Sequence, residues 1–239
     1  MRFTVRVPAT SANLGSGFDC LGVALTLFNE FTVDTGEPEG ITIEGEGATM
    51  LPRDGRNLVY RTMQQFFQSL GRPLPSFRLT LRNDIPLTGG LGSSSAALVG
   101  GLLLANALAD QPLERWALLE RAAQQEGHPD NVAPAMLGGF VAAVLDGDRL
   151  AAVPLAVPPT LLERLHAVLF IPNFRMPTRE SRRLLPGSVP LRDAVFNLSR
   201  AALWVAALQA GRLDLLPIAA EDRLHQPYRS ALFPAMPRF

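Results

Sequence analysis

A glycine- and serine-rich segment, PLTGGLGSSSAA at residues 86–97, has the composition of a phosphate-binding loop. Its glycines let the backbone approach a ligand closely, and the apolar run that follows predicts a helix beginning at the serines. The N–H groups of a first helical turn and the positive end of the helix dipole attract anions without help from a lysine. The segment therefore predicts a phosphate site, although the same composition also suits a plain loop that ends in a helix cap.

The charged residues exclude several kinds of catalysis and of binding partner. The 239 residues include 22 basic and 22 acidic ones, and every basic residue is an arginine. The absence of lysine excludes a lysine-type P-loop, a protein-kinase strand lysine and Schiff-base catalysis. The neutral balance argues against nucleic acid as a partner. The single cysteine, Cys20, and three scattered histidines predict neither an internal disulfide nor a zinc cage, which favours the reducing cytoplasm.

Hydropathy gives no sign of export or of a membrane anchor. The N-terminal residues alternate between apolar and polar types and become polar by Thr10, unlike a signal peptide. The most apolar stretch, residues 96–109, contains Asn106 and is too short to cross a bilayer, so it predicts a buried helix. We therefore expect a cytoplasmic protein that does not bind membranes.

The predicted elements come in blocks. We expect strands in the first fifty residues, and further strands and helices along the rest of the chain. The later strands are predicted at 77–81, 140–145, 151–157 and 167–171, and the helices at 57–70, 93–109, 113–125, 130–137, from 178, 191–210 and 213–224. Blocks of strands and helices without regular βαβ alternation predict an α+β fold. Pro158-Pro159 marks a seam, which places two domains at 1–155 and 156–239.

Three motifs carry a family resemblance. PATSANLGSGFDCLG at 8–22, PLTGGLGSSSAA at 86–97 and EGHPDNVAP at 126–134 resemble, in order and spacing, the motifs of the GHMP kinase superfamily. Within it, the first and third together resemble the homoserine kinases, and weaker signatures are NLVY at 57–60, TRESR at 178–182 and DRLHQPYR at 222–229. The resemblance implies a two-domain fold, with an ATP-binding N-terminal domain like ribosomal protein S5 and a smaller α+β C-terminal domain.

For the nucleotide, the resemblance implies that the loop backbone wraps the phosphates of ATP and that Asn57 contacts the adenine. Asn57 is also placed to cap a helix, and the two roles are compatible. Ser94 and Glu120 are implied to hold Mg²⁺, with Thr178 near the γ-phosphate, whereas without the resemblance Glu120 is an ordinary exposed carboxylate on a helix. The residues implied in nucleotide binding are Asn57, Pro86, Leu87, Thr88, Gly89, Gly90, Leu91, Gly92, Ser93, Ser94, Ser95 and Ala96.

For the second substrate, the resemblance implies L-homoserine, which presents an ammonium, a carboxylate and a hydroxyl. Asn13 and Asp19 would accept the ammonium, and the guanidinium groups of Arg182 and Arg229 would hold the carboxylate. The remaining residues implied to line the pocket are His128 and Asn131. Taken alone, Asp19 also suits a turn and Arg182 a solvated helix face. Arg200 and His225 receive no role, and Cys20 is interpreted as a small buried apolar residue.

The implied reaction transfers the γ-phosphoryl group of ATP to the hydroxyl of L-homoserine, a step of threonine biosynthesis. Glu120→Gln is expected to impair turnover through Mg²⁺, and Arg182→Ala to impair homoserine binding. No general base is assigned, because a loose transition state depends mainly on alignment and charge neutralisation.

The family pattern also implies a third glycine-rich motif beyond the position of Phe239, so we expect a shortened form with an incomplete second domain. Homodimerisation is a further expectation from the family. Two alternatives stay open at this point. One is another small-molecule kinase of the superfamily, and the other is a catalytically inactive nucleotide-binding fragment.

Overall fold

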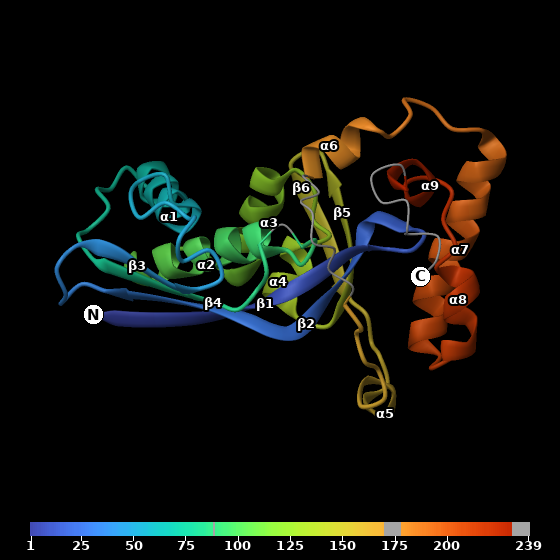
Figure 1. Cartoon of the computed structure of the whole chain (residues 1–239), viewed down its shortest axis with the longest axis horizontal. Coiled ribbons are helices and arrows are strands. Elements are labelled where there is room, and N and C mark those ends of the chain that lie inside the picture. Colours follow the sequence, from blue (N-terminus) through green and yellow to red (C-terminus); the bar gives the residue numbers. More distant parts are fainter. Residues whose placement is uncertain (88, 170–177, 231–239) are drawn as a thin grey trace.

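The computed structural model describes residues 1–87, 89–169 and 178–230, and these form a six-stranded sheet with helices packed on it and a helical segment at one end (Figure 1). Strand order is β3-β4-β2-β5-β6, with β1 paired to β2, and all neighbours are antiparallel except β3 with β4. The strands are β1 (Arg2–Leu14), β2 (Gly17–Asp34), β3 (Gly40–Gly45), β4 (Arg78–Asn83), β5 (Phe140–Asp146) and β6 (Arg149–Pro154).

The β1–β2 hairpin is the longest feature of the sheet. Its register runs from Arg2 opposite Asp34 to Leu14 opposite Gly17, with shifts between Pro8 and Thr10 and between Ala12 and Leu14. β2 pairs with β4 through residues 29–34 but with β5 through residues 21–23. In Figure 1 the hairpin, in blue, runs from the N-terminal end of the molecule to the red helices α7 and α9. The turn of the hairpin therefore lies beside helices from the C-terminal part of the chain.

The main core lies between the sheet and the helices α1 (Leu58–Ser69), α2 (Ser93–Leu108), α3 (Arg115–Glu126) and α4 (Val132–Leu137). α2 is apolar on nearly every face, as expected of a helix surrounded by other elements. Gly100 and Gly101 allow close packing, because a Cβ at Gly100 would collide with the Phe31 ring and one at Gly101 would press on Thr62. This tight packing holds the start of α2 in a fixed place.

A second, smaller core joins the helical segment to the sheet. Leu21 of β2 packs there with Leu161, Trp204 and Leu208, and the rings of Phe140 and Trp204 lie 5.7 Å apart. The elements of this segment are α5 (Pro159–Leu162), α6 (Thr178–Arg183), α7 (Leu191–Gln209), η1 (Leu213–Leu215), α8 (Leu216–Ala219) and α9 (Gln226–Arg229). Apolar contact with the hairpin and β5 therefore fixes the position of these helices.

The α+β class and most of the predicted elements are confirmed, and two predictions are wrong. The strand predicted at 167–171 has no regular structure in its described part, residues 167–169. The helix predicted at 213–224 divides into η1 and α8, because Pro217 cannot continue a preceding helix and is instead accommodated in the first turn of α8. The domain boundary at 155 stays a prediction. Within the described residues, no helix combines the length and apolarity that a membrane crossing requires.

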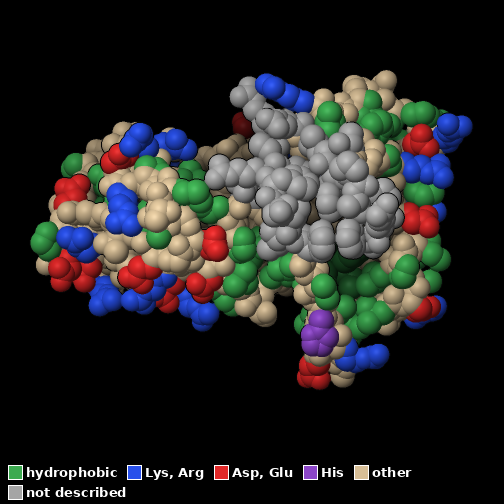
Figure 2. Space-filling model, viewed as in Figure 1, with side chains coloured by type: hydrophobic (Ala, Val, Ile, Leu, Met, Phe, Trp, Pro, Cys, Tyr) green, Lys and Arg blue, Asp and Glu red, His purple; other side chains and the backbone are tan. Residues whose placement is uncertain are grey.

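Charges of both signs mix on the surface of the sheet. Figure 2 shows basic and acidic side chains side by side at the end of the molecule formed by β1 to β4. Arg82 of β4 bridges Glu30 of β2 at 3.3 Å and Glu44 of β3 at 3.1 Å. Such exposed pairs contribute little free energy, about 0–1 kcal/mol each. They link neighbouring strands on the solvent face.

Candidate active site

A cavity of about 610 Å³ opens between the start of α2, the start of α1 and the hairpin. Most of the residues implied by the sequence motifs line this cavity. These are Asn13, Asn57, Pro86, Leu87, Gly89, Gly90, Leu91, Gly92, Ser93, Ser94, Ser95, His128, Asn131, Arg182 and Arg229. Thr88 and the side chain of Thr178 lie outside the described part of the chain, and Ala96 is buried behind the loop. Asp19 is not among the described residues that line the cavity, but it is hydrogen-bonded to Arg182, which does line it.

The glycine–serine loop leads directly into α2. Gly92 is the N-cap residue of the helix and has φ +68°, and as a glycine it has no side chain that could cap the N-terminus. A Cβ at Gly92 would collide with Thr10 Oγ1, and the Thr10 N–H donates to the Leu91 carbonyl at 3.1 Å. The loop is therefore pressed against β1, while Ser93, Ser94 and Ser95 line the cavity at the positive end of a helix dipole.

Asn57 is buried beside the cavity and caps α1, as predicted. Its Oδ1 accepts the Val59 N–H at 3.0 Å, and its Nδ2 donates to the Pro52 carbonyl at 2.9 Å. These bonds fix both the start of α1 and the orientation of the amide. Contact with an adenine ring stays a prediction.

The carboxylate beside the loop belongs to Glu126 rather than Glu120. Glu126 Oε1 accepts the Ser95 hydroxyl at 2.9 Å and lines the cavity. Glu120 is not among the described lining residues, and its Oε1 accepts the Leu150 N–H of β6 at 3.1 Å. Helical geometry explains this difference, because residues six apart face directions about 120° apart and differ by about 9 Å in rise. The structure therefore does not bring Glu120 to Ser94.

The oxygen atoms beside the loop are of the kind that binds Mg²⁺. The described residues hold no cluster of three or more His, Cys, Asp or Glu side chains suited to a metal. A magnesium ion shared with phosphates needs only a few protein oxygens. The exposed Ser94 hydroxyl and the Glu126 carboxylate both line the cavity, so the residues present fit such an ion.

His128 is oriented by a buried carboxylate. Its Nδ1 donates to Asp130 Oδ1 at 2.7 Å, and the Asp130 side chain is fully buried. This hydrogen bond raises the pKa of His128 above its ordinary value of 6.5, against the opposing effect of burial. Asn131 is oriented in a similar way, because Thr10 Oγ1 donates to its Oδ1 at 2.8 Å. The Nδ2 group of Asn131 is then the donor that this side chain can offer to a ligand.

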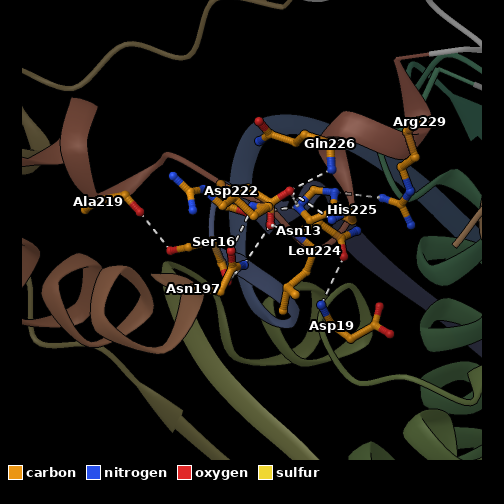
Figure 3. Close-up of polar contacts among 12 residues, drawn as sticks. Asn13, Ser16, Asp19, Asn197, Ala219, Asp222, Leu224, His225, Gln226 and Arg229 are labelled. Carbon is orange, nitrogen blue, oxygen red and sulfur yellow. Dashed lines mark hydrogen bonds and ion pairs between the residues drawn. The ribbon is translucent and has the colours of Figure 1, made fainter. Parts of the chain in front are cut away.

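Asp19 and Arg182 pair directly at the end of the cavity nearest the hairpin turn. The guanidinium donates to both carboxylate oxygens, at 2.6 and 2.9 Å, and this pairing raises the pKa of Arg182. Asn13 Oδ1 accepts the Asp19 N–H at 3.0 Å, as Figure 3 shows. Asn13 and Asp19 both have positive φ, +58° and +55°, a conformation that is tolerated where surrounding contacts enforce it.

The Arg229 side chain extends from α9 and lines the cavity at the same end as Arg182. The guanidinium carbons of Arg182 and Arg229 lie 5.7 and 5.2 Å from the centre of the Phe18 ring. Burial, together with the charge of Arg182, lowers the pKa of Arg229. Two arginines and a carboxylate thus meet around one aromatic ring, an arrangement suited to a small ligand that carries both charges.

Comparisons with known proteins agree with this geometry. The family model described as GHMP kinases N terminal domain matches residues 57–139. The homoserine kinase of Moorella thermoacetica is 48% identical over 232 residues, which cover 97% of this chain and 77% of that protein. The chain belongs to the homoserine kinase family. The homoserine kinase of Thermus thermophilus is 47% identical over 231 residues, covering 96% of this chain and 76% of that protein.

A solved structure extends the family relationship to three dimensions. The crystal structure of homoserine kinase from Cytophaga hutchinsonii superposes with a TM-score of 0.81 at 30% identity, covering 99% of this chain and 76% of that one. The α+β fold described above is therefore the fold of the homoserine kinase family.

Some site residues in this family member were not assigned from the sequence. Glu126 and Asp130 lie inside the EGHPDN motif, so the signal was present, but the residue roles were not separated. Thr10 lies in the first motif, and its contact with Asn131 joins positions 121 residues apart. His225 lies four residues before Arg229, the spacing of neighbours on a helical turn.

Proposed function

We propose that this chain transfers the γ-phosphoryl group of ATP to the hydroxyl of L-homoserine, giving O-phospho-L-homoserine and ADP. The observation that carries the proposal is that one cavity is lined both by the start of α2, whose N-cap residue is a glycine, and by Arg182 and Arg229, which pack on the Phe18 ring. The first suits a phosphate and the second suits an amino acid. Membership in the homoserine kinase family supports the same reaction.

At the nucleotide end, we assign phosphate binding to the N–H groups of the loop and of the first turn of α2. The positive φ values of Gly90 and Gly92, +71° and +68°, let successive N–H groups point toward one ligand. Asn57 and the neighbouring α1 start would border the base. Backbone donors of this kind need no lysine, which is consistent with a sequence that contains none.

At the amino-acid end, L-homoserine would exchange partners with the Asp19–Arg182 pair. Asp19 would accept the ammonium, while Arg182 and Arg229 would receive the carboxylate. Before the substrate binds, Asp19 and Arg182 neutralise each other. A ligand that separates them must therefore offer a positive group to Asp19 and a negative group to Arg182. This requirement selects an α-amino acid over a neutral alcohol.

Magnesium is the implied cation, and Ser94 and Glu126 would hold it. The ion, when bound, neutralises charge on the phosphates. The chain's own residues then have the task of alignment. The loop fixes the nucleotide, the charged cluster fixes the amino-acid head group, and the hydroxyl is directed toward the phosphate. No general base is assigned, although His128 lines the same space.

The test is a coupled assay of ADP release with a set of acceptors. L-Homoserine is expected to stimulate ADP release, whereas its methyl ester, which lacks the carboxylate charge, and mevalonate are expected to be poor acceptors. Mass spectrometry of the product identifies the phosphorylated hydroxyl. Equal stimulation by mevalonate or a sugar would contradict the proposed substrate, and nucleotide binding without any turnover would contradict the proposed activity.

A further inference from the structure

A buried carboxylate organises the turn that leads into α9. The Asp222 side chain is fully buried and accepts hydrogen bonds at both oxygens (Figure 3). Oδ1 accepts from Asn197 Nδ2 at 2.7 Å, and Oδ2 accepts the N–H groups of His225 and Gln226 at 2.9 and 2.6 Å. Burial acts to raise the pKa of Asp222, but these hydrogen bonds outweigh it and hold that pKa below its ordinary value. The carboxylate therefore holds the backbone at His225, the residue that precedes α9, in one position.

The two ring nitrogens of His225 have different partners. Nε2 lies 2.8 Å from the carbonyl oxygen of Gly15 at the hairpin turn, and Nδ1 lies 3.4 Å from an Arg229 guanidinium nitrogen. A carbonyl only accepts and a guanidinium only donates. The proton must therefore be on Nε2, and Nδ1 must carry the lone pair. Both contacts hold together only in this one neutral tautomer.

Arg229 depends on that lone pair. Its Nε is buried without a hydrogen-bond partner among the described residues, and burial of the guanidinium is unfavourable. The Phe18 ring packs against it and also stacks on His225, with ring centroids 5.0 Å apart. Arg229 also lines the cavity, where the exposed part of its guanidinium can pair with the acceptor oxygens of a ligand.

We infer that His225 is a positioning residue, whose Nδ1 lone pair aims the Arg229 guanidinium at the carboxylate of the amino-acid substrate while its Nε2–H anchors the ring to the hairpin turn. The inference rests on the proposed function, because that function supplies the carboxylate. It gives a role to a histidine that does not touch the substrate. It also explains why the ring is only 4% exposed beside a charged group.

The inference predicts a dependence on pH. Protonation of His225 would put a hydrogen on Nδ1 and a second positive charge beside Arg229, and the contact would be lost. The charged groups around the ring are Asp222 and Arg229 on its own segment, with Asp19 on the hairpin and Arg182 on α6. Burial lowers the pKa of His225, so the loss belongs to the acid side of 6.5. The KM for homoserine should rise there.

Two substitutions separate the two ring contacts. Asparagine at position 225 places its amide oxygen near the position of Nδ1, so it keeps an acceptor for Arg229. Glutamine at position 225 places its amide nitrogen near the position of Nε2, so it keeps a donor for the Gly15 carbonyl. In His225→Gln, the KM for homoserine is expected to rise about tenfold, which corresponds to ~1.4 kcal/mol. In His225→Asn, it should stay within about twofold of the wild type and lose the acid-side rise. The KM for ATP and kcat are expected to be unchanged in both.

The melting temperature of each variant controls for a merely structural role. A rise of the homoserine KM that is equal in both variants, or that follows the loss of melting temperature, would overturn the inference. So would an unchanged KM in His225→Gln. Each measurement is made on the full chain, with the wild type assayed in parallel.

The tautomer is measured without any assay of activity. Nitrogen-15 NMR of the histidine rings in the full chain should show His225 protonated at Nε2 only, at about pH 7. A ring protonated at Nδ1, or at both nitrogens, would overturn the inference whether or not the chain phosphorylates homoserine. Absence of homoserine-dependent ADP release in the wild type would instead overturn the proposed function, so the two failures are distinguishable.

Discussion

The phosphate end of the cavity comes from one uninterrupted stretch, residues 86–97, whereas the amino-acid end is assembled from the hairpin turn, the 128–131 segment, α6 and α9. In the proposed function, backbone N–H groups are the donors at the first end, and charged side chains are the binding groups at the second. A site made of backbone tolerates changes of side-chain charge but does not tolerate added Cβ atoms. A site made of side chains has the opposite sensitivity.

The largest effect is expected for Gly92→Ala. The new methyl group would collide with Thr10 Oγ1, and alanine at φ +68° is also strained. Strain and collision together should lower the free energy of unfolding by about 3 kcal/mol and abolish measurable ATP binding. Urea unfolding and calorimetry with a non-hydrolysable ATP analogue measure the two effects.

Gly90→Ala is the matched control for that loop. Gly90 has φ +71°, but nothing lies within 4 Å of a Cβ placed there. Strain alone should cost about 1 kcal/mol. Equal losses in the two variants would show that the contact with β1 is not what shapes the phosphate end.

The next largest effect is expected for Asp19→Asn at the amino-acid end. The change removes the charge that pairs with Arg182 and would accept the ammonium. The kcat/KM for homoserine should fall about 100-fold, or ~2.7 kcal/mol, while the KM for ATP is unchanged. Asp214→Asn, at the exposed Arg212–Asp214 pair, should leave both constants unaltered. A parallel loss of ATP affinity would contradict the separation of the two ends.

A smaller effect is expected at the carboxylates of α3. Glu126→Gln should raise the Mg²⁺ concentration needed for half-maximal rate by about tenfold, because a neutral amide binds a hard cation weakly. Glu120→Gln, whose carboxylate accepts from Leu150, should change it little. The reverse order would return the metal role to Glu120 and show that α3 adopts a different rotation when nucleotide is bound.

The smallest effects are expected for the pH dependence of stability. The pKa of His128 is raised, so its contribution is complete below 6.5 and is lost as pH rises through the folded-state pKa. The pKa of His225 is lowered, so its contribution is complete above 6.5 and is lost as pH falls through the folded-state pKa. Melting temperatures of His128→Asn and His225→Asn should therefore differ from wild type on opposite sides of 6.5, by about 2 °C. A shift on the same side in both variants would contradict these assignments.

The phosphate end could be predicted from the sequence because its signals are local. Asn57 and the apolar spacing after it marked α1, and the glycines before the apolar run marked the start of α2. The amino-acid end needed the family resemblance to identify Arg182 and Arg229. Glu126 and Glu120 could not be separated, because the rotation of a helix depends on its packing rather than on the motif. The strand predicted at 167–171 rested on local apolar residues that find no strand partner in the described part, residues 167–169.

The spacing of four residues places His225 beside Arg229, but its role could not have been assigned from the sequence. Its partner at Gly15 is 210 residues away, and its burial results from contacts with the hairpin. Only the three-dimensional arrangement distinguishes it from a surface histidine.

The reach of the β1–β2 hairpin also has a consequence for the order of folding. The Ser16 hydroxyl donates to the Ala219 carbonyl at 2.7 Å, across 203 residues of chain. Closing so large a loop is entropically costly and slow, whereas contacts within the first 139 residues complete the phosphate end. During synthesis, the nucleotide half of the cavity can therefore form on the ribosome well before the amino-acid half exists. An early intermediate that binds nucleotide but not homoserine is the expected species.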